Sequence, residues 1–291
     1  MIQKNIFRLF IVITFFTANF SYGKYVAIGH AKTSDAQVTT ELIKQVLERN
    51  RFNVATKSGP IDLMFDMLAE REIDFFVGGR LTTTHKEYWD KHKEKIIPVG
   101  LLFEGGSYFF GVPSYLSKQN VKSISDLVKE ANASKIKKEI LVLKSDLEML
   151  LQAQEAMTEY QLSQNGFTLK KLGEKEYAET IQEHWKKKEN FVLGMRRPYY
   201  LNHSLKIRKL EDPESTFHAS ADAYLVANRE SWDYIKKVHR TMLKKIEISV
   251  KSVEEMDYAV RVKKMPLHDV ARRWMGSRPY TVEYWLEPDI E

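Results

Sequence analysis

The chain has 291 residues, 43% of them hydrophobic and 29% charged, so it is long enough to bury the core of one large or two medium domains. Its 15 Phe, 14 Tyr and 5 Trp, against only 13 Gly and 8 Pro, exclude disordered and low-complexity architectures. The absence of Cys excludes disulfides, thiolate metal sites and a lipid-attachment cysteine. The net charge of +6 is spread over segments that also carry Glu and Asp, which is typical of a solvated surface and gives no reason to expect a nucleic-acid partner.

The N-terminus has the pattern of a secretory signal peptide. Two basic residues precede an apolar run from Leu9 to Thr17, and the small residues Ser21 and Gly23 stand three and one positions before a cleavage point. The run is far shorter than the ~20 residues that a membrane-spanning helix needs. We therefore expect residues 1–23 to be removed on export and the mature protein to work in the periplasm.

The mature chain begins with alternating strand and helix patterns. Apolar runs predict strands at residues 25–29, 52–56 and 73–77, and helical spacing predicts helices through 38–47 and 63–68. This βαβαβ order predicts a parallel sheet with helices on its faces. Ligands bind at the carboxyl ends of such strands, so we expect the loops at 30–34, 58–61 and 78–85 to converge.

The same alternation of strand and helix patterns predicts a second lobe. Strand patterns at 140–143, 167–169 and 191–194 alternate with helical patterns at 147–151 and 177–185. A strand at 223–227, followed by a helical stripe from Trp232 to Leu243, predicts a return to the first lobe. We expect an α/β protein with mixed, mostly parallel sheets and two crossover segments, near Gly111 and Ala221. The first lobe is then 24–110 plus 221–291, the second is 111–220, and a ligand cleft lies between them.

Motifs of catalysis and of metal binding are missing from the sequence. There is no nucleophile elbow, zinc-protease motif, P-loop or dinucleotide-binding glycine motif. The eight His show no i, i+4 pairing of the kind that holds zinc. The acidic cluster of Glu254, Glu255 and Asp257 lacks a calcium-loop glycine and is expected to be solvated. We therefore expect no catalytic residue, no metal and no cofactor; a periplasmic enzyme would need a nucleophile that the sequence does not offer.

Several sequence blocks, in order along nearly the whole mature chain, resemble the glycine betaine, choline and proline-betaine binding proteins of ABC transporters. The blocks are Leu81–His85 with Tyr88-Trp89, Phe103–Gly106 with Val112–Tyr115, Val121–Leu127, Leu210–Pro213, and the closing segments Ala271–Met275 and Val282–Leu286. The resemblance implies a type II periplasmic-binding-protein fold and a monomer that delivers a small solute to an inner-membrane ABC permease. A sensor subunit that uses the same fold to report to a signalling partner is the alternative.

The expected ligand box departs from the family pattern. The family holds a quaternary ammonium among aromatic rings by cation–π attraction. Here Arg80 stands at a position where the family commonly has Trp. The segment from Met195 to Tyr199 follows a Gly after which relatives have Trp, and His30 stands in a loop that in relatives often carries an aromatic residue. A fixed guanidinium repels a trimethylammonium group, so the departures predict a different ligand.

Three features still suit an anionic group on the ligand: Arg80, the Gly105–Ser107 loop, which resembles the family loop that holds a carboxylate by backbone N–H groups, and the start of the helix after residue 33. The candidate ligand-binding residues are His30, Arg80, Thr82, Gly105, Gly106, Ser107, Tyr108, Met195, Arg196 and Tyr199. Structural alternatives stay open for several of them: an ion pair between the lobes for Arg80, a helix cap for Thr82, and a core position for Tyr199.

Overall fold

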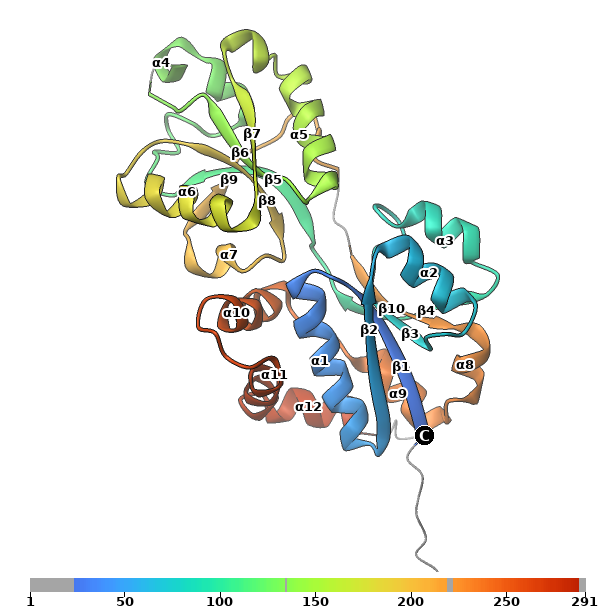
Figure 1. Ribbon diagram of the computed structural model, residues 1–291. Helices are drawn as coiled ribbons and strands as arrows, with labels where there is room; N and C mark the ends of the chain where they lie inside the picture. Colours follow the sequence, from blue (N-terminus) through green and yellow to red (C-terminus); the bar gives the residue numbers. More distant parts are fainter. Residues whose placement is uncertain (1–23, 134, 219–221, 288–291) are drawn as a thin grey trace, which may run out of the picture.

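The computed structural model describes residues 24–133, 135–218 and 222–287, which form two five-stranded sheets with helices packed against them (Figure 1). The predicted signal peptide, 1–23, and the predicted crossover at Ala221 lie outside the described residues. The strands of the first sheet, in spatial order, are β2 (Phe52–Gly59), β1 (Lys24–Ala31), β3 (Phe75–Gly79), β10 (Ala223–Asn228) and β4 (Ile96–Phe103). Those of the second are β7 (Thr168–Leu172), β6 (Glu139–Leu143), β8 (Val192–Arg197), β5 (Ser107–Pro113) and β9 (Ile207–Lys209).

Both sheets are mixed in the same way. In the first, β1 pairs with β2 and β3 in parallel, while β10 is antiparallel to β3 and β4. In the second, β6 pairs with β7 and β8 in parallel, while β5 is antiparallel to β8 and β9. Each sheet therefore has two parallel and two antiparallel pairings, because one strand, β10 in the first sheet and β5 in the second, runs against the other four.

Helices cover both faces of the first sheet, and we call this sheet with its helices the first lobe. The helices are α1 (Ser34–Arg49), α2 (Ile61–Ala69), α3 (Lys86–His92), α8 (Arg229–Tyr234), α9 (Lys237–Lys245), α10 (Val250–Arg261), α11 (Leu267–Gly276) and α12 (Pro279–Leu286). Successive residues of β3 point to opposite faces. Accordingly, Phe75 packs in the core under α1 and α9 to α12, whereas Phe76 packs in the core under α2 and α3.

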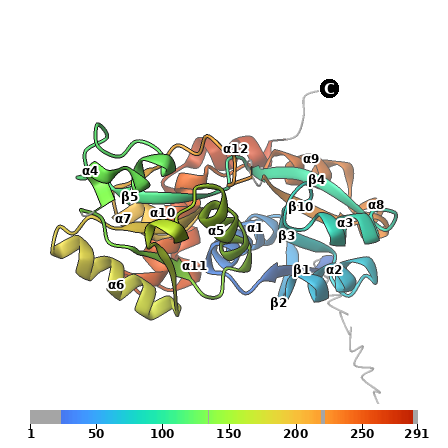
Figure 2. The ribbon, with the colours of Figure 1, turned by 90° about the horizontal axis from the view of Figure 1, so that it is seen from above.

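The second lobe is built in the same way around its own sheet. Its helical elements are the 3₁₀ turns η1 (Ile124–Val128) and η2 (Ser163–Asn165), and the helices α4 (Glu130–Ala133), α5 (Leu147–Glu159), α6 (Glu174–Lys186) and α7 (Leu201–Ser204). Phe109 of β5 packs under α6 and α7, and Phe110 packs under α5. Figures 1 and 2 place the two lobes side by side, with α10 of the first lobe next to α7 of the second.

The change from the first sheet to the second comes earlier than the predicted crossover at Gly111. Gly111 lies inside β5, whose residues pair with β8 from Ser107 onward. The chain therefore passes between the sheets at 104–106, directly after β4. Gly105 has φ +78°, a left-handed conformation that favours glycine, so the change of direction occurs at a residue suited to it.

Candidate functional site

Two adjoining cavities lie between the lobes, where loops from the carboxyl ends of β1, β3 and β6 meet. The first, of about 530 Å³, is lined by Arg80 and is called here the Arg80 cavity. The second, of about 600 Å³, is lined by Gln152 and is called the Gln152 cavity. Thr84, Glu87, Tyr108 and Glu148 line both, so the cavities form one cleft. The predicted convergence of loops is confirmed, since Thr33, Ile61 and the segment Gly78–His85 all contribute to its wall.

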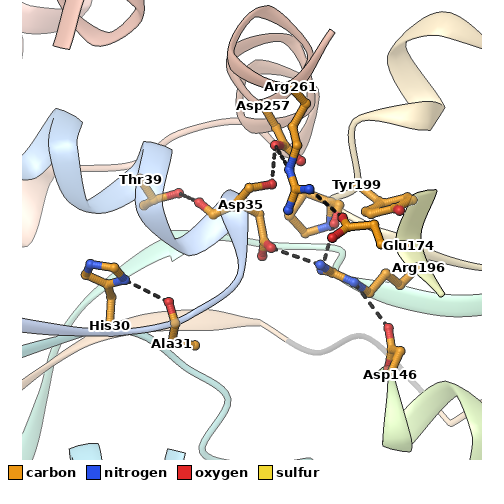
Figure 3. Close-up of polar contacts among 12 residues, drawn as sticks. His30, Ala31, Asp35, Thr39, Asp146, Glu174, Arg196, Tyr199, Asp257 and Arg261 are labelled. Atoms are coloured by element: carbon orange, nitrogen blue, oxygen red, sulfur yellow. Dashed lines mark hydrogen bonds and ion pairs between the residues drawn. The ribbon is translucent and has the colours of Figure 1, made fainter. Parts of the chain in front are cut away.

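Arg196 lines the cleft and joins the two lobes (Figure 3). Its Nη2 donates to Oδ1 of Asp35, in the first turn of α1, at 2.9 Å, and its Nε lies 3.2 Å from Oδ2 of Asp146, the N-cap of α5. Burial alone would lower the pKa of the guanidinium, but the two carboxylates raise it well above the ordinary value. Burial would likewise raise the pKa of Asp35, yet the charges of Arg196 and Arg80 hold it below its usual range.

Arg80 follows β3 on the opposite wall of the cleft. Its guanidinium carbon lies 5.8 Å from the centre of the Phe103 ring. The backbone N–H of Arg80 donates to Nδ1 of His85 at 3.0 Å, which requires a lone pair on that nitrogen. Burial, with the charge of Arg80, lowers the pKa of His85 to about 3, so the imidazole is neutral and fixes the loop that carries Arg80.

The cleft contains no box of indole rings among the described residues. Besides His85 and His218, its aromatic side chains are Tyr88, Phe103 and Tyr108. Arg80 already covers a face of Phe103, so that face is taken by a cation of the protein itself. Burial and the charge of Asp146 raise the pKa of Tyr108 to about 12, so its hydroxyl stays protonated.

The structure brings part of the predicted site together. Arg80, Thr82, Ser107, Tyr108 and Arg196 line the cleft. Thr82 is not the cap of α3, whose N-cap position is held by His85.

The other predicted residues lie outside the cleft wall. His30 is buried, with its Nδ1 2.7 Å from the carbonyl oxygen of Ala31. Gly105 donates its N–H to Oδ1 of Asp222, so the predicted carboxylate loop instead ties the two crossing segments together. Gly106 lines neither cavity. Met195 and Tyr199 belong to the core under α6 and α7, where the Tyr199 ring packs 5.3 Å from the Arg196 guanidinium.

Sequence reasoning missed the acidic side of the cleft. Asp146 and Glu148 open α5, and Gln152 follows one turn later. A signal was present: Asp146 follows a predicted buried strand and precedes a helical pattern, which is the position of an N-cap at the ligand edge of a sheet. The role of Asp35 was missed as well: Thr33 holds the N-cap position of α1, and Asp35, in the first turn, pairs with Arg196.

Glu254 and Asp257 of the acidic cluster on α10 are buried, contrary to the prediction, whereas Glu255 is exposed. Glu254 accepts two hydrogen bonds from Arg197 of β8, at 2.9 and 2.8 Å. Asp257 accepts from Ser34 and lies 3.8 Å from Arg261, which pairs in turn with Glu174 of α6 at 2.6 Å (Figure 3). Arg196, Arg197 and Arg261 thus each join one lobe to the other.

Two features are not found in the part of the chain that the structure describes: a metal-binding cluster and a membrane-spanning helix. No group of three or more His, Asp or Glu side chains there could hold a metal ion. No described helix combines the length and the hydropathy that crossing a membrane would require.

Comparisons with known proteins give a consistent result. The model of a family described as the substrate binding domain of ABC-type glycine betaine transport systems matches residues 24–277. Among solved structures, lactococcal OpuAC in its closed, liganded conformation with glycine betaine is similar at 20% identity, over 91% of this chain and 100% of that one, with a TM-score of 0.74. No curated protein matches the sequence significantly.

Two further structures share the fold. The glycine betaine/L-proline-binding protein ProX from Borrelia burgdorferi is 20% identical over 91% of this chain and 97% of its own, with a TM-score of 0.71. An ABC-transporter choline-binding protein in complex with choline is 16% identical over 91% and 92%, with a TM-score of 0.69. At such identities the likeness concerns the fold, and it confirms the predicted two-lobed architecture.

Proposed function

Because this chain belongs to the family of substrate-binding domains of ABC-type glycine betaine transport systems, we propose that it closes its two lobes over a small solute whose anionic group is met by Arg80. The protein is the substrate-binding component of an ABC importer. It acts by binding and release, as a monomer without catalysis, and hands the solute to the permease in the inner membrane.

The position of Arg80 carries the proposal for an anionic group. The guanidinium lines the cleft and stands over the Phe103 ring, where a methylated ammonium would otherwise find an aromatic face. Two cations at contact in a partly desolvated cleft repel each other by several kcal/mol at an effective dielectric constant of about 20. A carboxylate, sulfonate or phosphate reverses the sign of this interaction, and a guanidinium can meet it with two parallel hydrogen bonds.

Closure of the lobes is supported by apolar side chains that face the cleft. Leu147 and Leu151 stand on successive turns of α5, and their exposed fractions are 72% and 69%. Both line the Arg80 cavity, whose first-lobe wall includes Ile61 and Tyr88. Burying a leucine side chain stabilises a state by about 1.5–3 kcal/mol, so movement of α5 toward the first lobe would be favoured once a solute neutralises the charges between them.

Export to the periplasm is part of the same proposal. The N-terminal segment has the order of a signal peptide, and cleavage after Gly23 would leave Lys24, the first residue of β1, at the start of the mature chain. We take the lobes as 24–110 plus 221–291 and 111–220, with the boundary adjusted to the change of sheet at 104–106.

A thermal-shift screen with Arg80→Ala tests the anionic group. A ligand at ~100 times its dissociation constant adds about 2.7 kcal/mol to stability. Acidic and zwitterionic solutes should raise the melting temperature of the wild type, and choline, which has no anion, should not. Arg80→Ala should lose the response, whereas Arg272→Ala, which removes an exposed arginine from α11, should keep it. Tight binding of choline, or an unchanged response in Arg80→Ala, would contradict the proposal.

A further inference from the structure

Gln152, which lines the Gln152 cavity, carries a buried hydrogen-bond acceptor that nothing in the described protein satisfies. Gln152 is 4% exposed and lies one turn after Glu148 on α5. Its Nε2 donates to Oε1 of Glu148 at 2.6 Å. Because a carboxylate only accepts, this bond fixes the amide orientation and leaves Oε1 of Gln152 as an acceptor. That oxygen is buried and has no partner among the described residues, and neither does Oγ1 of Thr83 across the cavity.

The charges around this cavity leave an excess of carboxylate. Its one lysine, Lys86, pairs with Asp90, four residues along α3. Glu87 and Glu148 also line the cavity, and in the described part of the chain neither has an ion-pair partner. His218 lies 3.4 Å from Glu155 and is mostly exposed. The cavity wall is therefore negative, although the adjoining Arg80 cavity holds two guanidinium groups.

An unsatisfied buried acceptor selects the kind of cation that can bind beside it. A protonated amine or a guanidinium brings N–H donors for both Gln152 and Glu148. A fully methylated ammonium has the same charge but no donor, so it would leave the amide oxygen unpaired and separate Glu148 from water. The only Phe, Tyr or Trp ring that the Gln152 cavity offers among the described residues is Tyr108, which is too little for an aromatic cage.

We propose that the Gln152 cavity binds the positively charged end of the solute and that this end carries N–H groups, so that the transported class is a zwitterion with a primary or secondary ammonium or a guanidinium. The inference rests on the proposed function, since the anionic end of the same solute is assigned to Arg80. Tyr108 lines both cavities, and its hydroxyl feels the charges of Asp146 and Glu148 as well as those of Arg80 and Arg196.

Titration calorimetry with two methylation series tests the inference. The probes are glycine and 4-aminobutanoate, each with zero, one, two and three methyl groups on nitrogen, so that charge and carboxylate stay constant while N–H donors are removed. Affinity should fall along at least one series, with a loss by a factor of about 10 to 100 for the trimethylated member. In Glu148→Gln and in Gln152→Leu, the affinity should differ less between the methylated and unmethylated members of the series. The control Glu159→Gln, an exposed glutamate at the end of α5, should preserve it.

The possible outcomes separate the two proposals. If the trimethylated members bind as tightly as the unmethylated ones, or more tightly, the N–H requirement is wrong while an anion at Arg80 still stands. If Glu148→Gln and Gln152→Leu both keep the full discrimination, the positive end binds elsewhere and the inference is also wrong. If no member of either series binds, the solute is not a short zwitterion and the inference fails, while the thermal-shift response of Arg80→Ala decides on its premise.

Discussion

Replacing Asp257 by Asn should change how the stability of the protein depends on pH. Asp257 is fully buried on α10, accepts a hydrogen bond from Ser34, and has no partner for Oδ2 among the described residues. Burial raises the pKa of its carboxyl from 3.8 to about 6, against the opposing effect of the Ser34 bond. Since a factor of ten in an equilibrium is about 1.4 kcal/mol, keeping Asp257 ionised costs the folded state about 3 kcal/mol.

The sign of the effect follows from proton binding. Below pH 4 the carboxyl is protonated in both the folded and the unfolded chain, so it contributes no pH dependence. Between pH 4 and 6 the unfolded chain loses the proton while the folded protein keeps it, so the contribution of Asp257 to stability falls as pH rises. Above pH 6 both forms are ionised and the penalty is complete. The amide that Asp257→Asn introduces does not titrate, so the variant lacks this fall.

Urea denaturation at pH 4, 5, 6, 7 and 8 measures the difference. The free energy of unfolding of Asp257→Asn minus that of the wild type should rise by about 2–3 kcal/mol from pH 4 to pH 8, whatever constant offset the amide introduces. The control Asp233→Asn removes a mostly exposed carboxylate that pairs with Arg240. For this control, the free energy of unfolding minus that of the wild type should stay constant over the same pH range. A flat difference for Asp257→Asn, or one that falls with pH, would mean that Asp257 is stably ionised beside Arg261 and would refute the reasoning.

Three other predictions follow from the same contacts. Arg196→Met should lower the free energy of unfolding by about 3–5 kcal/mol, because Asp35 and Asp146 lose their shared cation while largely buried; a change below about 1 kcal/mol would contradict this. Gly194→Ala should destabilise by about 1–3 kcal/mol, since a Cβ there would lie 2.6 Å from Met149 Cε and 2.9 Å from Val142 Cγ1; unchanged urea denaturation would be the opposite result. Mass spectrometry of the exported protein should give a chain beginning at Lys24, and an intact Met1 would argue against cleavage.

Much of the fold could be predicted because buried strands are continuous apolar runs, which can be recognised from neighbouring residues alone. Runs such as Phe75–Val77 and Ile140–Leu143 identify their strands directly, and the βαβ order identifies the parallel part of each sheet. The segment of β4 was missed, because Pro98 and Gly100 interrupt its apolar run. β4 lies at the edge of the first sheet, where a proline is tolerated.

Residues whose position depends on distant pairing could not be predicted. Tyr108 to Val112 is a strand pattern in the sequence, but only its pairing with β8, more than 80 residues later, assigns it to the second lobe. In the cleft, the position of Arg80 could be predicted because it lies in the loop after β3. The contacts of Arg196 could not, because its partners come from α1 and α5, which are far from it in the sequence. Asp257 and Glu254 look like a solvated helix face, and they are buried because α1 of the first lobe and the second lobe both pack against α10.

The central claim is that one zwitterionic solute bridges the two lobes in the cleft, with its charges sorted between the two cavities. A crystal structure of the protein with the tightest-binding zwitterion of the methylation series tests this most directly. In that structure the anionic oxygens should lie about 3 Å from the Arg80 guanidinium and the N–H groups at similar distances from Glu148 and Gln152, with Leu147 and Leu151 buried by closure. A ligand with its positive group against aromatic rings, or one held by a single lobe without closure, would contradict it.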